Sequence, residues 1–179
     1  IRNLGYEAIG SMNDTSLAIP YAIKAGLGEY GKNGLLITKK FGPRVRLGKI
    51  YTNLPLRHDK PIEFGVKKIC NICNLCSQGC PVKAIPEGLP SAQTHNISNI
   101  SGVNKWSVDG EKCFSFWASQ NSDCSICIRV CPYNKDYSLR IHRIGLKLAG
   151  TWLRHFMLWL DVKLSYGSRH KSKQWWKKD

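Results

Sequence analysis

Residues 70–81, CNICNLCSQGCP, decide the fold of this 179-residue chain. They have the spacing Cys-x2-Cys-x2-Cys-x3-Cys-Pro, in which three thiolates hold one iron–sulfur cluster and the fourth ligates a neighbouring cluster. A second run at residues 113–132 also closes in Cys-x3-Cys-Pro. Two [4Fe–4S] clusters need eight thiolates, and the chain contains eight cysteines. The sequence therefore predicts a ferredoxin-like domain with two clusters.

The same spacing assigns each cysteine to a cluster, because the last cysteine of each run ligates the cluster of the other run. The first cluster is predicted to bind Cys70, Cys73, Cys76 and Cys131. The second cluster is predicted to bind Cys80, Cys113, Cys124 and Cys127. Apolar residues flank both runs, and such a jacket would keep water away from the sulfurs.

Two other uses of the cysteines fit this chain less well. A disulfide framework is typical of short domains that lack a core, whereas 42% of these residues are hydrophobic. Structural zinc could occupy two sites of four cysteines each. The spacing Cys-x2-Cys-x2-Cys, however, brings three ligands very close together, which suits a cubane better than two separated zinc sites.

The chain is strongly basic, with a formal net charge of +15. Residues 135–179 contribute +8 of this, from eleven Lys and Arg against three Asp. Such a tail first suggests nucleic acid. Here it also carries Trp152, Trp159 and other aromatic residues, a mixture typical of segments that lie at membrane surfaces. We therefore expect no nucleic-acid partner.

Residues 139–164 place an apolar residue at every third or fourth position, which predicts one amphipathic helix. Lys147, Arg154 and Asp161 interrupt the segment, so it has no run of about 18 apolar residues that could cross a bilayer. The helix could lie on anionic lipid or against a membrane partner. It could equally pack on its own domain with a basic face in water, and the sequence leaves both open.

The part of the chain before the first cysteine has the pattern of an α+β structure. Residues 6–9 predict a short strand, and the polar residues 13–16 offer N-caps for a helix that continues to Ile23. Residues 35–38 and 45–52 predict two strands joined as a hairpin. A ferredoxin would not need this extra layer, so a function besides electron storage is expected.

Several short motifs occur in a fixed order along most of the chain. They are AGLGE at 25–29, Thr38 with FGPRVR at 41–46, TNLPL at 52–56, DKPI at 59–62, and Trp106-x2-Asp109-x3-Cys113-Phe114-x2-Trp117. In this order they resemble the C-terminal part of the corrinoid-dependent reductive dehalogenases. Ile1 in place of an initiator Met, without a signal segment after it, likewise leads us to expect a piece of a larger protein.

The resemblance implies an α+β fold in three parts. Residues 1–62 would be the C-terminal part of a nitroreductase-like, corrinoid-binding layer, residues 63–138 the ferredoxin-like domain with two [4Fe–4S] clusters, and residues 139–179 the amphipathic basic tail. It also implies an oxidoreductase that removes halide from a chlorinated or brominated hydrocarbon. In the family, a base-off cobalt corrinoid of the cobalamin type receives electrons through the two clusters.

The family's site residues carry over to few positions of this chain. Its proton-donating Tyr would precede Ile1, so the chain lacks it. Arg46 resembles the basic residue that stabilises the phenolate, with Arg44 as the alternative, and Asn13 resembles the family's Asn. Arg46 could instead be a strand residue facing solvent, and Asn13 a helix cap. Trp117 would line an apolar substrate cavity or else pack over a cluster.

The resemblance further implies the partners and the location of the whole protein. The partners are an organohalide substrate, a small membrane-anchor protein and an electron donor from the respiratory quinone pool. The location is the exterior face of the cytoplasmic membrane, as a peripheral protein whose export signal is absent from this chain. Two alternatives stay open: an epoxyqueuosine reductase-like enzyme, which shares the corrinoid and both clusters but acts on tRNA, and a two-cluster electron-transfer subunit.

Overall fold

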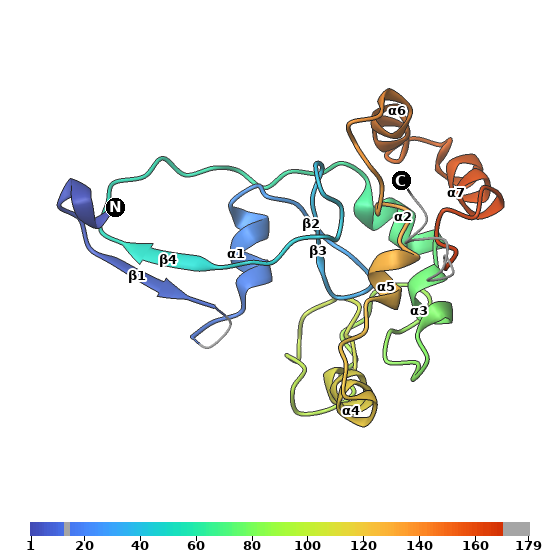
Figure 1. The fold of residues 1–179 in the computed structure, drawn as a ribbon, viewed down its shortest axis with the longest axis horizontal. Helices are drawn as coiled ribbons and strands as arrows, with labels where there is room; N and C mark the ends of the chain where they lie inside the picture. The colour runs from blue at the N-terminus through green and yellow to red at the C-terminus, as the bar shows by residue number, and fades with distance from the viewer. Residues whose placement is uncertain (13–14, 170–179) are drawn as a thin grey trace, which may run out of the picture.

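This computed structural model describes residues 1–12 and 15–169, in which short strands occur only before residue 53 and helices alone follow (Figure 1). In chain order they are η1 (Arg2–Leu4), β1 (Ala8–Ser11), α1 (Ala18–Lys24), β2 (Glu29–Tyr30), β3 (Leu36–Ile37), β4 (Lys49–Thr52), α2 (Val66–Ile72), α3 (Leu75–Gly79), α4 (Gly110–Gln120), α5 (Ile126–Arg129), α6 (Arg140–Leu148) and α7 (Arg154–Lys163). The predicted mixture of helices and strands is confirmed. The β1–β4 ribbon lies at one end of the molecule, and α2, α3, α5, α6 and α7 gather at the other (Figure 1).

The strands form two small antiparallel sheets. β1 pairs with β4, and the register places Ile9 opposite Tyr51. β2 pairs with β3, and here Tyr30 lies opposite Leu36. Both residues of β3 are buried, whereas neither strand of the β1–β4 ribbon has a buried residue. The ribbon is therefore a surface feature, while β3 belongs to the core.

The predicted hairpin between residues 35–38 and 45–52 is wrong. The physical reason is a tight turn at residues 31–34, which folds β3 back onto β2 before the chain reaches the later strand. The Gly31 N–H donates to the Leu35 carbonyl at 2.9 Å, and Gly34 adopts φ +77°, a conformation that glycine reaches without strain. β4 pairs with β1 instead, so the later strand has a partner other than β3.

Helix α1 begins without the side-chain cap that the sequence predicts. Its N-cap is Leu17, which makes no side-chain capping bond. The Ser16 hydroxyl lies 2.7 Å from the Tyr51 hydroxyl on β4, so this predicted cap is used to hold the helix to the ribbon. The Thr15 hydroxyl lies 2.5 Å from the Ser11 hydroxyl and does not cap the helix either. The other two candidate caps, Asn13 and Asp14, lie outside the described residues.

One apolar core joins all three parts into which the sequence was divided. Its buried residues come from β3, α2, the second cysteine run and the end of α6: Ile37, Val66, Ile69, Cys73, Tyr133 and Ala149. A second core group contains Cys76, Cys80, Ala84 and Ile85. Cysteines therefore form a substantial part of both cores. The boundaries at 62 and 138 stay a prediction.

The tail forms two helices, α6 and α7, where the sequence predicts one. The helical stripe is interrupted at residues 149–153, which include Gly150, a poor helix former. α7 packs against both α2 and α6. The Lys135 Nζ lies 2.5 Å from Asp161 Oδ1, and both side chains are mostly buried. This ion pair ties α7 to the segment that follows Cys131.

The tail has an apolar inner face and an apolar outer face. Leu146, Ala149 and Leu158 pack into the first core from the inner side. We call the outer side the tail patch, which exposes Ile141, Ile144, Trp152, Phe156 and Trp159. Within the described ranges, no helix is both long enough and apolar enough to cross a membrane.

Replacing Gly42 with Ala is expected to lower stability much more than replacing Gly88 with Ala. Both glycines have positive φ, +58° and +77°, which costs a residue with a Cβ about 1–2 kcal/mol. A Cβ at Gly42 would also clash with the Tyr133 carbonyl oxygen, whereas a Cβ at Gly88 meets nothing within 4 Å. Thermal unfolding of the two variants measures the difference. Equal losses would show that the close approach of Gly42 to Tyr133 does not support the fold.

Candidate metal centres

The first candidate centre is a small cavity lined by four cysteines, Cys70, Cys73, Cys76 and Cys131. Cys70 lies in the last turn of α2, Cys73 is the residue at which α2 ends, and Cys76 lies in α3. Cys131 reaches the same cavity from the second cysteine run, shortly after α5. The structure therefore brings together the four residues that the spacing groups.

The second candidate centre lies where α3, α4 and α5 approach one another. Cys80 ends α3, Cys113 lies in α4 and Cys127 lies in α5, and all three belong to the second core group. Cys124 lies in the loop before α5. Burial is the main cause that raises the pKa of Cys113 and of Cys127, and the nearby Cys124 thiolate charge raises both further. Cys76 packs in this group as well, so the two centres adjoin.

The donor set fits two four-iron clusters. All eight cysteines are free thiols. Among residues 1–12 and 15–169, no three His, Cys, Asp or Glu side chains lie close enough together to hold a single metal ion. One zinc ion brings each sulfur to about 2.3 Å from a single centre. A four-iron cluster instead lies between its thiolates and keeps them further apart.

Burial keeps the thiols of the first centre protonated until metal binds. It raises the pKa of Cys70 to about 11 and that of Cys76 to about 12, and it raises the pKa of Cys131 well above its ordinary value. Because metal binds the thiolate, assembly of a cluster here must release protons. The same apolar surroundings keep water away from the sulfurs.

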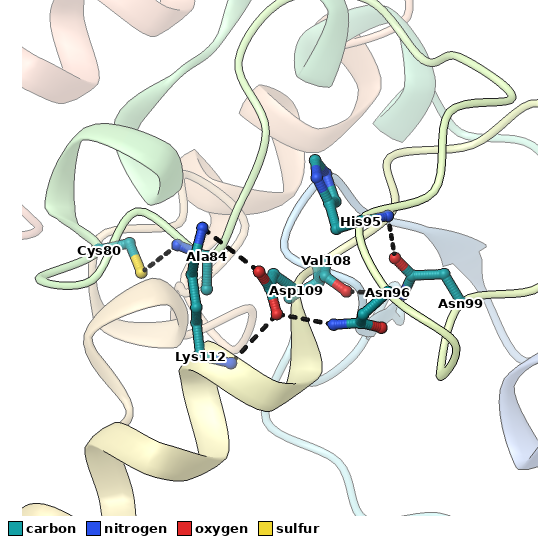
Figure 2. Close-up of polar contacts among 8 residues, drawn as sticks. All are labelled: Cys80, Ala84, His95, Asn96, Asn99, Val108, Asp109 and Lys112. Atoms are coloured by element: carbon teal, nitrogen blue, oxygen red, sulfur yellow. Dashed lines mark hydrogen bonds and ion pairs between the residues drawn. The ribbon is translucent and has the colours of Figure 1, made fainter.

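Backbone N–H groups point at a sulfur in each centre. The Lys32 N–H donates to Cys70 Sγ at 3.4 Å, and the Ala84 N–H donates to Cys80 Sγ at 3.3 Å. Figure 2 shows the second bond beside Asp109, whose own N–H donates to the Ala84 carbonyl at 2.8 Å. Such hydrogen bonds stabilise negative charge on the sulfur, and they are one of the features that set a cluster's potential.

Asp109 fixes the start of α4 and therefore the position of Cys113. Its carboxylate accepts hydrogen bonds from the Lys112 N–H at 3.1 Å and from Asn96 Nδ2 at 2.8 Å (Figure 2). The Lys112 backbone N–H is also the main cause that lowers the pKa of Asp109. A carboxylate at this position caps the helix. It also attaches the loop that contains Asn96.

Glu29, the last residue of the AGLGE motif, supports the first centre. Its carboxylate accepts hydrogen bonds from the backbone N–H groups of Phe64, Val66 and Lys67 at the start of α2. Negative charge at a helix N-terminus is favourable. The contact spans more than thirty residues of chain, so a local capping pattern could not reveal it.

Lys32 also supports the first centre, and the sequence did not predict this role. Its side chain is 1% exposed, and it lines the cavity of the first centre. Its Nζ donates to the Cys73 carbonyl at 2.8 Å. Lys32 stands in a Gly-Lys-Asn-Gly turn, a composition typical of exposed loops. The sequence therefore carries no signal for the burial of this lysine.

The residues predicted to take part in catalysis or to line the substrate cavity lie outside the two centres, as far as the structure describes them. Arg46 is exposed in the irregular segment between β3 and β4, not on the predicted strand. Arg44 Nη2 donates to the Lys135 carbonyl at 2.6 Å, which ties this segment to the second cysteine run. Trp117 is 37% exposed on α4. Asn13 lies outside the described residues. The catalytic and substrate roles of these residues stay predictions.

Residues 69–134 match a family model described as a 4Fe-4S double cluster binding domain. This range contains all eight cysteines. The predicted domain with two clusters is therefore confirmed.

The chain is also similar to enzymes named tetrachloroethene reductive dehalogenase. It is 39% identical to the one from Sulfurospirillum multivorans over 178 residues, which are 98% of this chain and 35% of that relative. It is 48% identical to one from Desulfitobacterium hafniense over 140 residues, which are 75% of this chain and 25% of that relative. The chain thus spans about a quarter to a third of the length of these curated relatives.

A solved structure agrees with this similarity. The structure of a catabolic reductive dehalogenase in complex with 3-bromo-4-hydroxybenzoic acid matches with a TM-score of 0.82 at 31% identity, covering 94% of this chain and 24% of that chain. Epoxyqueuosine reductases are more distant. The one from Lactococcus garvieae is 29% identical over 149 residues, which are 74% of this chain and 36% of that relative.

Pairs of cysteine variants are expected to reveal which thiolates share a cluster. Replacing Cys70 and Cys131 with Ala removes ligands of one cluster only, so about four of about eight iron atoms should remain. Replacing Cys70 and Cys80 removes ligands of both clusters, although these two lie in the same run. Almost no iron should then remain. Iron analysis after anaerobic purification measures both. The reverse result would show that each run holds its own cluster.

Proposed function

We propose that this chain, which belongs by sequence and fold to the reductive dehalogenases, delivers electrons within an enzyme that removes halide from an organohalide. The observation that carries the proposal is 39% identity over 98% of the chain together with the cysteines gathered at two centres. The overall reaction is R–X + 2 e⁻ + H⁺ → R–H + X⁻. A carbon–halogen bond breaks, a carbon–hydrogen bond forms, and the two electrons come from a donor outside the chain.

The chain's own part in this reaction is to hold two clusters next to each other in dry surroundings. When bound, each [4Fe–4S] cluster accepts one electron and passes it on. Ile69 and Tyr133 pack around the first centre, and Ala84 and Ile85 around the second. Because Cys76 lines the cavity of the first centre and also packs in the second core group, an electron needs to cross only a short distance through protein.

Residues 1–62 would supply part of a nitroreductase-like layer that binds a corrinoid. A hollow of about 570 Å³ lies between α1 and the segment 103–106, with Leu17, Ile23 and Trp106 in its lining. This hollow has room for one edge of a large cofactor, which the rest of the protein would enclose. When bound, a cobalt corrinoid supplies the metal centre at which the carbon–halogen bond is cleaved.

Arg46 and Asn13 are the proposed partners of a proton-donating Tyr in the part of the protein that precedes Ile1. An Arg beside a Tyr stabilises the phenolate, which lowers the pKa of the Tyr, and it can also meet the departing halide. The exposed position of Arg46 supports this role, because its side chain can face another part of the protein. Trp117 is the proposed lining residue of the apolar substrate cavity.

The tail patch supports a membrane-associated location. Its three large aromatic residues lie beside basic ones, and the Lys163 ammonium stands 5.1 Å from the ring centroid of Trp159. Exposed apolar surface of this kind marks interaction sites. The proposed partner is a small membrane-anchor protein at the exterior face of the cytoplasmic membrane, and the proposed electron donor is the respiratory quinone pool.

Metal analysis and an activity assay on the full-length protein, purified without oxygen, test this function. About eight iron and about one cobalt per chain are expected. With a chemical reductant, the protein should release halide from tetrachloroethene or from 3-bromo-4-hydroxybenzoic acid. Iron without cobalt, and no halide after corrinoid is supplied, would overturn the proposal in favour of an electron-transfer subunit. Reduction of an epoxyqueuosine-modified tRNA without halide release would overturn it in favour of a tRNA enzyme.

Changing Trp152 and Trp159 to Ser in the full-length protein tests the tail patch. Burial of a large apolar side chain is worth about 1.5–3 kcal/mol, so membrane association should weaken by about tenfold or more. Fractionation of cell membranes measures the bound share. Phe114→Ser is the matched control, since Phe114 is 69% exposed on α4. Unchanged association of the double variant would remove the tail patch from the binding surface.

A further inference from the structure

Lys32 places a charged side chain in the interior, directly at the first centre. It is among the largest fully buried side chains of the described residues, with 1% of its surface exposed. It lies in the turn between β2 and β3, outside both cysteine runs. Its side chain lines the same cavity as the four cysteines of that centre. Lys32, from the part of the chain before the first cysteine, therefore helps to form the first centre, although the four cysteines of that centre all come later in the sequence.

The partners of the Lys32 ammonium are all uncharged. Nζ donates to the Cys73 carbonyl at 2.8 Å and to Asn74 Oδ1 at 2.6 Å, and it lies 5.7 Å from the centroid of the Trp106 ring. Both ion pairs found within residues 1–12 and 15–169 involve other lysines, Lys112 and Lys135. A cation buried without a counter-charge is strongly disfavoured. A negative charge close to the Lys32 ammonium would therefore stabilise this part of the interior.

An iron–sulfur cluster in the cavity would supply that charge. An oxidised [4Fe–4S] cluster with four thiolates carries about −2, and reduction adds one further negative charge. A fixed positive charge in surroundings of low dielectric constant favours the more negative, reduced form. The Lys32 backbone N–H also donates to Cys70 Sγ at 3.4 Å. Lys32 would thus act on the same cluster through both its main chain and its side chain.

We infer that the charge of Lys32 raises the reduction potential of the cluster at Cys70, Cys73, Cys76 and Cys131. The inference rests on the proposed function, because it takes two clusters to be present. Lys32 is then a tuning residue and not a ligand, and it biases electrons toward the first cluster. If Lys32 only held the Cys73 carbonyl and Asn74 in place, the potential would not depend on its charge.

Redox titration of the complete, cluster-loaded protein, followed by electron paramagnetic resonance, tests the inference. Lys32→Gln removes the charge and keeps an amide that can donate to the Cys73 carbonyl. One of the two reduction waves should move to lower potential. At its former midpoint, the ratio of reduced to oxidised cluster should fall about tenfold, which is about 59 mV for a one-electron couple. The wave of the second cluster should stay in place.

Three further variants separate charge from structure. Lys32→Arg keeps the charge and should keep the midpoint. Lys40→Gln removes the same charge from an exposed position eight residues further along and should move neither wave. Asn74→Asp leaves Lys32 in place but sets a carboxylate beside its ammonium, so it should lower the first wave as Lys32→Gln does. The Asp can still accept the N–H of Gly88, which Asn74 accepts in the native protein.

Iron analysis of each sample keeps the two proposals distinguishable. Wild-type protein without about eight iron atoms would overturn the two-cluster function itself. If iron is complete and neither Lys32→Gln nor Asn74→Asp moves a wave, the role of Lys32 is overturned while the proposed function stands. A shift of both waves by the same amount would also overturn it, because a charge at one cavity must act most on the nearest cluster. If the Lys32→Gln protein loses iron, the midpoint of the Asn74→Asp protein alone decides whether the charge of Lys32 sets the potential.

Discussion

Eight thiolates must converge on two centres, and most of this structure serves that requirement. The helices that carry the first run are very short: α2 has seven residues and α3 has five. Both end at a cysteine, Cys73 and Cys80 respectively. Helices of this length are not stable alone in water. They are held by the two core groups in which the cysteines themselves pack, so that metal binding and core formation depend on each other.

The N-terminal part of the chain is built into the first centre. Glu29 caps α2, Lys32 enters the cavity, Gly42 approaches the Tyr133 carbonyl and Arg44 binds the Lys135 carbonyl. These contacts join residues before 62 to both cysteine runs. An electron carrier would not need them, whereas an enzyme that passes electrons onward to a second cofactor needs a fixed connection between its clusters and that cofactor's domain.

The β1–β4 ribbon and the tail helices α6 and α7 lie at opposite ends of the molecule (Figure 1). The β1–β4 ribbon buries none of its residues, and Ile9 and Ile50 are more than half exposed. A ribbon of two strands is marginally stable by itself. In our proposal the ribbon belongs to a larger corrinoid-binding layer, while the tail patch at the other end meets the membrane anchor. The cluster core then stands between the substrate side and the membrane side.

The sequence alone determined the double-cluster domain and the overall mixture of helices and strands. The two-cluster prediction could succeed because a cubane selects ligands by short, local spacing, which is written directly in the order of the residues. Tertiary structure alone decided that β4 pairs with β1, that Glu29 caps α2 and that Lys32 is buried. The strand pairing, the cap and the buried charge all arise from contacts between residues far apart in the chain. No local pattern records such interactions, because each partner is chosen only when the chain folds.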